Sequence, residues 1–337
     1  AGLSGITITG DAFNVFVFLE ISTFAAYTLV SLGHTRRALR AAFTYLIMGT
    51  VGGTFLLLGI GFLYAATGTL NMVDIADRLQ VVGMSRAVLV AFAFIVVGSM
   101  IKLAVFPLHQ WLPNAYTHAP PVVTAFLAAT ATKVSYYVLV RVLLGIFGFH
   151  LVFETLHFGS LLLPLSLVGM FVGSAAAIYQ TDVKRLLAYS SIAQIGYLTL
   201  GLSLGNVDGL TGGIVHLFNH AVMKGGLFLV VACVVHAIGS SRVSDWSGLG
   251  KRMPVTAFAF VIGGFGLIGV LGTAGFVSKW YLVSGALDAG YLWLAGLILL
   301  SSLLAVVYVF RIIEIMYVRD PPADAKPVRV PTITMIL

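Results

Sequence analysis

Long apolar segments recur along the whole chain, and they constrain its fold more than any other feature. A helix needs about 20 mostly apolar residues to cross a bilayer, and about nine segments of this 337-residue sequence fit that template. The predicted spans are 11–33, 38–66, 87–107, 120–148, 158–179, 184–204, 208–239, 254–285 and 291–318. Most connections are short, and no soluble domain intervenes. We therefore predict an all-α fold, a polytopic transmembrane helical bundle that forms a single membrane domain over 1–337.

The composition agrees with a lipid environment. Hydrophobic residues make up 59% of the chain and charged residues only 9%, whereas soluble domains carry roughly 25% charged residues. A formal net charge of +7 would suggest nucleic acid in a soluble protein. Here the basic residues lie singly inside spans or in short loops, so no nucleic-acid partner is expected. Cys233 is the only cysteine, which excludes disulfides, iron–sulfur clusters and structural zinc within this chain.

The ends of the sequence look like cut points. Ala1 is not an initiator methionine, and no signal peptide precedes the first apolar segment. At the other end, "VRVPTITMIL" resembles the start of another span. We expect a fragment of a longer membrane protein that lacks helices at both ends.

Loop charges predict the orientation of the bundle. Four loops that follow odd-numbered spans are basic: 34–40, 181–185, 241–252 and 318–329. They lie on one side, and the positive-inside rule makes that side cytoplasmic. The stretch 109–119 is expected to be an uncharged loop on the same side. The predicted location is the inner (plasma) membrane, crossed many times.

Ionisable residues inside the predicted spans are the candidate functional residues. A charge at the bilayer centre costs several kcal/mol or more, so such groups usually face a partner or a cavity. The candidates for proton translocation are Glu20, Lys102, Lys133, His216, His220, Lys224 and Lys279.

Three of these residues share one face of a single span. His216, His220 and Lys224 are spaced four apart, which aligns them along a helix. Imidazoles titrate near neutral pH, so such a row suits proton transfer. The alternative is that these three side chains are hydrogen-bonded packing residues, in which case their contacts must offset the free-energy cost of desolvating all three. Glu20 is the only carboxylate deep in a span; it is either a counter-charge that controls one lysine or half of a static ion pair.

Two of the lysines lie beside helix-weakening residues. Pro107 follows Lys102, and a glycine-rich stretch precedes Lys279. The two spans cross the membrane in opposite senses, and matched broken spans in two halves are typical of a transporter site. The alternative is that the glycines only permit close helix packing. The predicted helix breaks are Pro107, Gly269, Gly272 and Gly275. His109 and His118 flank the first break as either a proton entry or structural caps.

Four segments carry a resemblance to a known family. They are "KLAVFPLHQWLPNAYTHAPPVVTAFLAATATK" (102–133), "TDVKRLLAYSSIAQIGY" (181–197), "HLFNHAVMKGGLF" (216–228) and "GTAGFVSKWYL" (272–282). They resemble the signature of the proton-conducting antiporter family. This family comprises the large membrane subunits of respiratory complex I, of membrane-bound hydrogenases and of the multisubunit Mrp cation/proton antiporters. The resemblance extends over essentially the whole chain.

The resemblance implies two inverted five-helix repeats with broken helices, here 1–148 as part of the first and 158–318 as the second. It implies that Glu20 and Lys102 form the family's Glu–Lys pair and that Lys133 is the bridging lysine. It further implies a central polar axis of His216, His220 and Lys224, with Lys279 as the terminal lysine. One departure is Leu271, where the family often has proline, so the second break depends on its glycines.

Within the family, the last two segments are most similar to the D-type subunit of the Mrp antiporters. This implies a proton-translocating subunit of a Na+/proton antiporter, with protons, Na+, the lipid bilayer and other membrane subunits as partners and no cofactor. The alternative is a pump subunit of an NADH:quinone oxidoreductase (complex I) or hydrogenase, whose redox centres would lie in other subunits. A third reading is a helical scaffold without transport.

Overall fold

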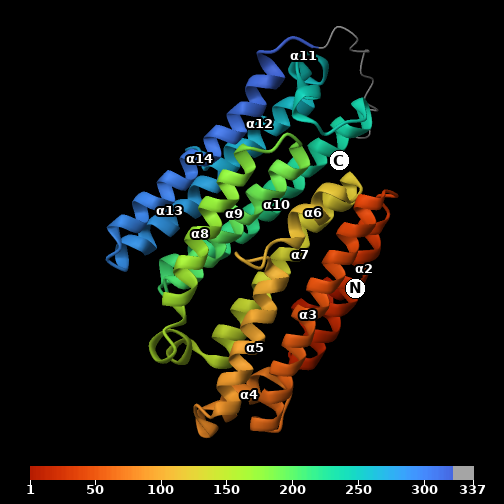
Figure 1. Ribbon diagram of the computed structural model, residues 1–337. Helices are drawn as coiled ribbons and strands as arrows, with labels where there is room; N and C mark the ends of the chain where they lie inside the picture. The colour runs from red at the N-terminus through yellow and green to blue at the C-terminus, as the bar shows by residue number, and fades with distance from the viewer. Residues whose placement is uncertain (322–337) are drawn as a thin grey trace.

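The described part of the computed structural model covers residues 1–321, which form a helical bundle without a sheet (Figure 1). The predicted all-α membrane bundle is thereby confirmed. The possible extra span at "VRVPTITMIL" and most of the loop 318–329 lie outside the described residues.

Eight helices within 1–321 are long and apolar enough to cross a membrane. They are α2 (Ala12–Ser31), α3 (Arg36–Thr67), α5 (Arg86–Leu103), α7 (Pro121–Val142, extended by the π-helical turn η1, Leu143–Phe147), α8 (Phe158–Ile178), α9 (Val183–Ser203), α10 (Val207–Ile238) and α14 (Leu292–Tyr317). The remaining predicted span, 254–285, is divided into α12 (Pro254–Ile268) and α13 (Ala274–Asp288). The fold thus contains the expected spans, one of them broken.

Shorter segments connect the spans. They are α1 (Gly2–Ile8), α4 (Met72–Val82), η2 (His150–Thr155), η3 (Val243–Trp246) and α11 (Leu249–Arg252).

The loop expected over 109–119 is wrong, because these residues form helix α6 (Trp111–His118). Pro113 occupies the first turn of α6, where a missing backbone N–H breaks no helical hydrogen bond. Trp111, Leu112 and Tyr116 are buried, so packing against the bundle stabilises this short helix. The preceding helix, α5, ends at Leu103, several residues before Pro107. The helix of the third span is therefore interrupted after Leu103 and followed by the short helix α6.

The same local structure occurs at the start of each half of the chain. Asp11 caps α2 and forms an antiparallel bridge with Asn71. Asp182 caps α9 and forms the equivalent bridge with Arg242. The first bridge lies at the start of α4 and the second at the start of η3, which leads into α11. Figure 1 shows α4 and α11 at opposite ends of the bundle. The two halves are therefore inverted copies of one another.

The long helices of the two halves match in the same way. α3 and α10 each have 32 residues. Thr35 and Asn206 cap their first turns with side-chain oxygens, and Gly68 and Gly239 end them in the left-handed conformation. Each long helix packs against the broken helix of its own half: α3 against α5 and α6, and α10 against α12 and α13.

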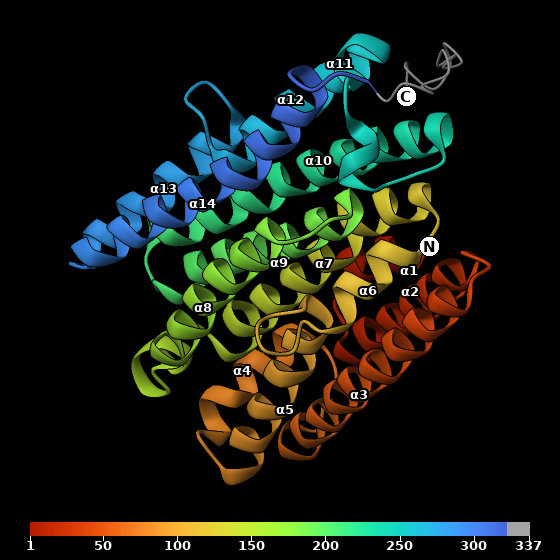
Figure 2. The ribbon, with the colours of Figure 1, turned by 45° about the horizontal axis from the view of Figure 1, so that its top comes forward.

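Helices α9 and α10 lie at the centre of the bundle. α10 also packs against α7 and α9, so it joins the two halves (Figure 2). In α9, 94% of the spanning window is buried. Polar side chains on α9 are therefore shielded from solvent and lipid alike.

The basic loops gather at one end of the bundle. Figure 1 shows the turn between α2 and α3, the start of α9, α11 and the end of α14 at the end opposite α4. Lys251 in α11 lies 3.4 Å from Asp320, which ties the loop after α14 to this end.

Candidate functional site

Glu20 and Lys102 form a buried ion pair between α2 and α5. The Lys102 ammonium donates to Glu20 Oε1 at 2.7 Å and to Thr23 Oγ1 at 3.4 Å. The lysine side chain is 3% exposed. Gly53 on α3 makes room for the carboxylate, because a Cβ there would overlap Glu20 Oε1. Lys102 also lies in the last turn of α5, where the helix dipole favours a positive charge.

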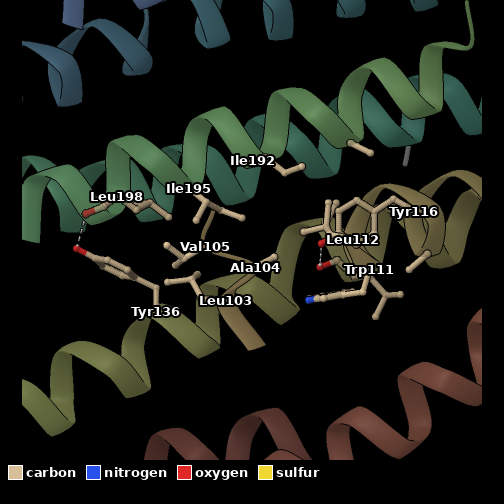
Figure 3. Packing of buried hydrophobic residues seen from close by; sticks show 14 of the residues in the cluster. Leu103, Ala104, Val105, Trp111, Leu112, Tyr116, Tyr136, Ile192, Ile195 and Leu198 are labelled. Atoms are coloured by element: carbon tan, nitrogen blue, oxygen red, sulfur yellow. Dashed lines mark hydrogen bonds between the residues drawn. The ribbon is translucent and has the colours of Figure 1, made fainter. Parts of the chain in front are cut away.

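The helix break beyond Lys102 is held by aromatic packing. Ala104 ends α5 in a left-handed conformation with φ of 61°. The Trp111 indole donates to Ile101 O at 2.9 Å and stacks on the Tyr45 ring at 4.2 Å. Figure 3 shows Leu103, Ala104 and Val105 between Tyr136 of α7 and the side chains of α9. The break is thus fixed by its neighbours on α3, α7 and α9.

A cavity of about 60 Å³ lies beside the ion pair. Lys102, Thr23 and Trp111 line one side, and Thr130 and Ser135 of α7 line another. About 10–15 Å³ suffices for one water when polar partners are present. The cavity therefore extends from Lys102 to the face of α7 that bears Thr130 and Ser135.

Within residues 1–321, the hydrogen-bond partners of Lys133 lie only on its own helix. Its ammonium contacts Ala128 O and lies 3.3 Å from Thr132 Oγ1. The ion pairs found among residues 1–321 give it no carboxylate. Helix α7 packs against α10, and Lys133 interacts electrostatically with His216, His220 and Lys224. Lys133 thus faces the polar row of the second half.

The three basic residues of α10 lie on one fully buried face. Each is 0% exposed. Lys224 donates to Leu187 O at 2.8 Å and contacts Ser190 Oγ, both on α9. The His216 and His220 rings stack 6.1 Å apart. Neither nitrogen of His220 has a hydrogen-bond partner within the described chain, so this ring is a buried polar group whose hydrogen bonds are unsatisfied.

Lys279 ends this row at the second helix break. His216 Nδ1 lies 2.9 Å from Ser278 Oγ, beside Lys279 on α13. The Lys279 ammonium donates to Leu267 O at 3.0 Å and Ile268 O at 2.8 Å, at the carboxyl end of α12. Gly269 there has φ of 82°, and a Cβ on it would lie 2.9 Å from Lys279 Cδ. The amine thus fills the gap between the half-helices.

The residues predicted as helix breaks have different local roles. Gly269 and Gly272 are left-handed, with φ of 82° and 86°. Gly275 lies inside α13, where the absence of a Cβ allows Gly266 O to approach closely. Pro107 lies in the connection between α5 and α6. Both breaks begin with a left-handed residue at the end of the first half-helix.

His109 and His118 lie apart from the buried row. Burial lowers the pKa of His109, and the Pro107 carbonyl opposes this shift. Burial is also the main cause that lowers the pKa of His118, with a further contribution from the positive charge of Lys184. Neither side chain hydrogen-bonds to the row within residues 1–321. Both lie around α6, at its start and its end.

Some residues of this region were not identified from the sequence. Lys184, expected in a basic loop, is 5% exposed and donates to Ala119 O at 2.5 Å, at the end of α6. Tyr197 and Ser302 contact Lys279. Neutral tyrosines and serines carry no charge that would mark them in an apolar helix, so only the contacts reveal them.

Comparison with known proteins gives consistent results. A family described as "NADH:quinone oxidoreductase/Mrp antiporter, TM" matches residues 9–305. The N-type subunit of the NADH-quinone oxidoreductase of Desulforudis audaxviator is 48% identical over 96% of this chain and 64% of its own length. The D-type subunit of the Na(+)/H(+) antiporter of Bacillus subtilis is 32% identical over 97% of this chain and 66% of its own length. This chain therefore spans slightly less than two thirds of either relative.

A solved structure of an Mrp complex contains a chain with a similar fold. A chain of the Mrp complex from Dietzia sp. DQ12-45-1b superposes with a TM-score of 0.89 at 31% identity, over 97% of this chain and 60% of that chain. The inverted halves and broken helices described above thus belong to a known architecture.

Proposed function

The chain belongs to the family of NADH:quinone oxidoreductase and Mrp antiporter membrane subunits, and we propose that it translocates protons as part of a multisubunit membrane complex. The observation that carries this proposal is the buried row of ionisable residues between the two helix breaks. Such a row is expensive inside a membrane protein, and intramembrane ionisable residues usually mark ion or proton pathways.

In this proposal the Glu20–Lys102 pair controls the first site. The ion pair at 2.7 Å favours a charged Lys102. The adjoining cavity supports exchange with the region of Lys133. From Lys133 the proton would pass to the His220 and His216 rings of α10.

The second site in this proposal is Lys279. His216 is bonded to Ser278, next to Lys279, and its ring is the last basic group before that lysine. Two like charges about 7 Å apart repel by roughly 2 kcal/mol at an effective dielectric constant of 20. Charging one site therefore changes proton occupancy at the next by more than tenfold, which provides a means of coupling.

For the assembly we propose an Mrp-type antiporter of Na+ or another monovalent cation against protons, in the inner membrane with the basic loops in the cytoplasm. The TM-score of 0.89 against a chain of an Mrp complex supports this assignment. The second candidate is the antiporter-like subunit of an NADH:quinone oxidoreductase, favoured by the 48% identity to an N-type subunit of such an enzyme. In both cases the partners would be other membrane subunits.

Proton transport in proteoliposomes that contain the full complex tests the function. Lys102→Ala and Lys279→Ala should abolish dissipation of a pH gradient, whereas Lys251→Ala, with a side chain that is 69% exposed, should behave as wild type. Wild-type transport in both buried variants would exclude the proposed path. Identification of the co-purifying subunits separates the assemblies: small antiporter subunits indicate the Mrp type, and flavin or iron–sulfur subunits indicate the redox type.

A further inference from the structure

The ammonium of Lys279 is enclosed by groups from three other helices. Besides the two α12 carbonyls, it donates to Ser302 Oγ on α14 at 2.9 Å. It also lies 4.6 Å from the centre of the Tyr197 ring on α9. The Tyr197 hydroxyl is 3.3 Å from Ser302 Oγ, so the ring and the serine are bonded to each other. Tyr197 is 1% exposed, so its ring lies inside the bundle.

We propose that Tyr197 and Ser302 are positioning residues that hold Lys279 at the second helix break in its protonated form, an inference that rests on the proposed function. The face of an aromatic ring attracts a cation, and the attraction grows when water is excluded. The carboxyl end of α12 adds the negative end of a helix dipole. All of these contacts favour the charged amine over the neutral one.

Lys133 provides the contrast within the same chain. In the described part of the chain, its amine hydrogen-bonds only to Ala128 O and Thr132 Oγ1 of its own helix. It has no aromatic ring beneath it among the cation–π contacts of residues 1–321. A proton shared between the two lysines would therefore favour Lys279. In this inference the enclosure retains the proton on Lys279, in the second half of the chain.

Other titratable groups near Lys279 do not account for this preference. From α9 it faces Tyr197, and from α10 it faces His216, which carries no negative charge. Helix α12 contains no ionisable residue. The ionisable residues on α14 all lie further along the helix than Ser302; they are Tyr308, Arg311, Glu314 and Tyr317. The stabilisation thus comes from neutral groups, namely the ring, the hydroxyl and the carbonyls.

The test measures proton transport against pH in proteoliposomes with the full complex. Tyr197→Leu removes the ring, and Ser302→Ala removes the hydroxyl. Each should weaken proton binding at Lys279 by about tenfold, seen as a shift of the half-maximal pH by about one unit toward acid. Tyr197→Phe keeps the ring and should restore most of the wild-type profile.

Ser166→Ala is the matched control, since this buried serine of the same half bonds to Leu162 O and Thr199 Oγ1 and to no lysine. It should leave the pH profile unchanged. Assembly of each variant is checked by the yield of intact complex. If Tyr197→Leu does not assemble, the inference is tested by the acid shift expected for Ser302→Ala and the near wild-type profile expected for Tyr197→Phe. Unshifted profiles in Tyr197→Leu and Ser302→Ala overturn the inference, whereas wild-type transport by both Lys102→Ala and Lys279→Ala overturns the proposed function itself.

Discussion

Gly53 on α3 and Lys224 on α10 occupy equivalent positions in the two inverted halves, each at the same distance from the capping residue of its helix. In the first half, the Glu20 carboxylate from α2 fills the space above Gly53. In the second half, Lys224 instead extends from the long helix to Leu187 O and Ser190 of α9. The backbone is repeated, but the charged group differs between the halves. In the first half it is a carboxylate from α2, and in the second half it is an ammonium carried by the long helix α10. This asymmetry places an acidic group beside the long helix of one half and a basic group on the long helix of the other.

The space at Gly53 leads to the first prediction. Gly53→Ala places a methyl group where Glu20 Oε1 now lies, so the carboxylate must move away from Lys102. Misplacement of a catalytic group by about 1 Å can cost on the order of 100-fold in rate. We therefore expect at least about tenfold slower proton transport in proteoliposomes, with both charged residues still present.

Gly61→Ala is the control for this substitution, because Gly61 lies on the same helix with no neighbouring atom within 4 Å of its Cβ position. It should transport at the wild-type rate. Equal rates for Gly53→Ala and Gly61→Ala would show that the position of Glu20 is not important.

The second prediction concerns the left-handed glycines of the second break. A non-glycine residue in this conformation costs about 1–2 kcal/mol, so Gly269→Ala and Gly272→Ala should both lower stability by about this amount. Only at Gly269 would the new methyl group also press on Lys279. We expect Gly269→Ala to impair transport and Gly272→Ala to retain it, as measured by thermal unfolding and proton transport. Equal transport by the two variants would contradict a role for close packing on Lys279.

The fold was predictable because the bilayer imposes a simple rule on sequence. Every spanning segment must be apolar over about 20 residues, and the predicted spans therefore coincide with observed helices. Helix α6 was missed because Pro107, Pro113 and two histidines make its sequence look like a loop. What stabilises α6 is the packing of Trp111 on Tyr45, a contact between distant parts of the chain.

The charged residues of the site could also be identified, because a buried charge is rare and costly in an apolar span. The neutral partners of these charged residues could not be identified from the sequence. Tyr197 and Ser302 are ordinary residues of a helical membrane protein, and their meeting at Lys279 depends on how α9, α13 and α14 pack. The burial of Lys184 depends in the same way on the position of α6.

The third prediction separates stability from function at the first ion pair. Removal of one partner of a buried pair leaves an uncompensated charge and typically costs about 3–5 kcal/mol. Lys102→Met should therefore destabilise the protein strongly, since Glu20 is left without its 2.7 Å partner. The double variant Glu20→Gln/Lys102→Met should recover most of the thermal stability in detergent but not proton transport. A double variant that transports protons would reduce the pair to a structural element.

The last prediction concerns pH and His118, at the basic end of the bundle. Burial is the main cause that lowers the pKa of His118 in the folded protein, and the positive charges of Lys184, Arg185 and Arg37 lower it further. Below the ordinary value near 6.5, the unfolded chain therefore binds a proton that the folded protein does not. The free energy of unfolding must then fall as the pH drops from about 6.5 toward the folded pKa. Nothing is lost above that range, where both states are neutral.

Substitution of His118 tests this expectation. Between pH 7.5 and pH 5.5, the melting temperature of the wild type in detergent should fall further than that of His118→Gln, which cannot titrate. His236→Gln provides the comparison, because His236 lies exposed at the end of α10. It should follow the wild type across the same range. If His118→Gln and wild type lose equal stability on acidification, the half-buried imidazole does not contribute to the acid sensitivity of this end of the bundle.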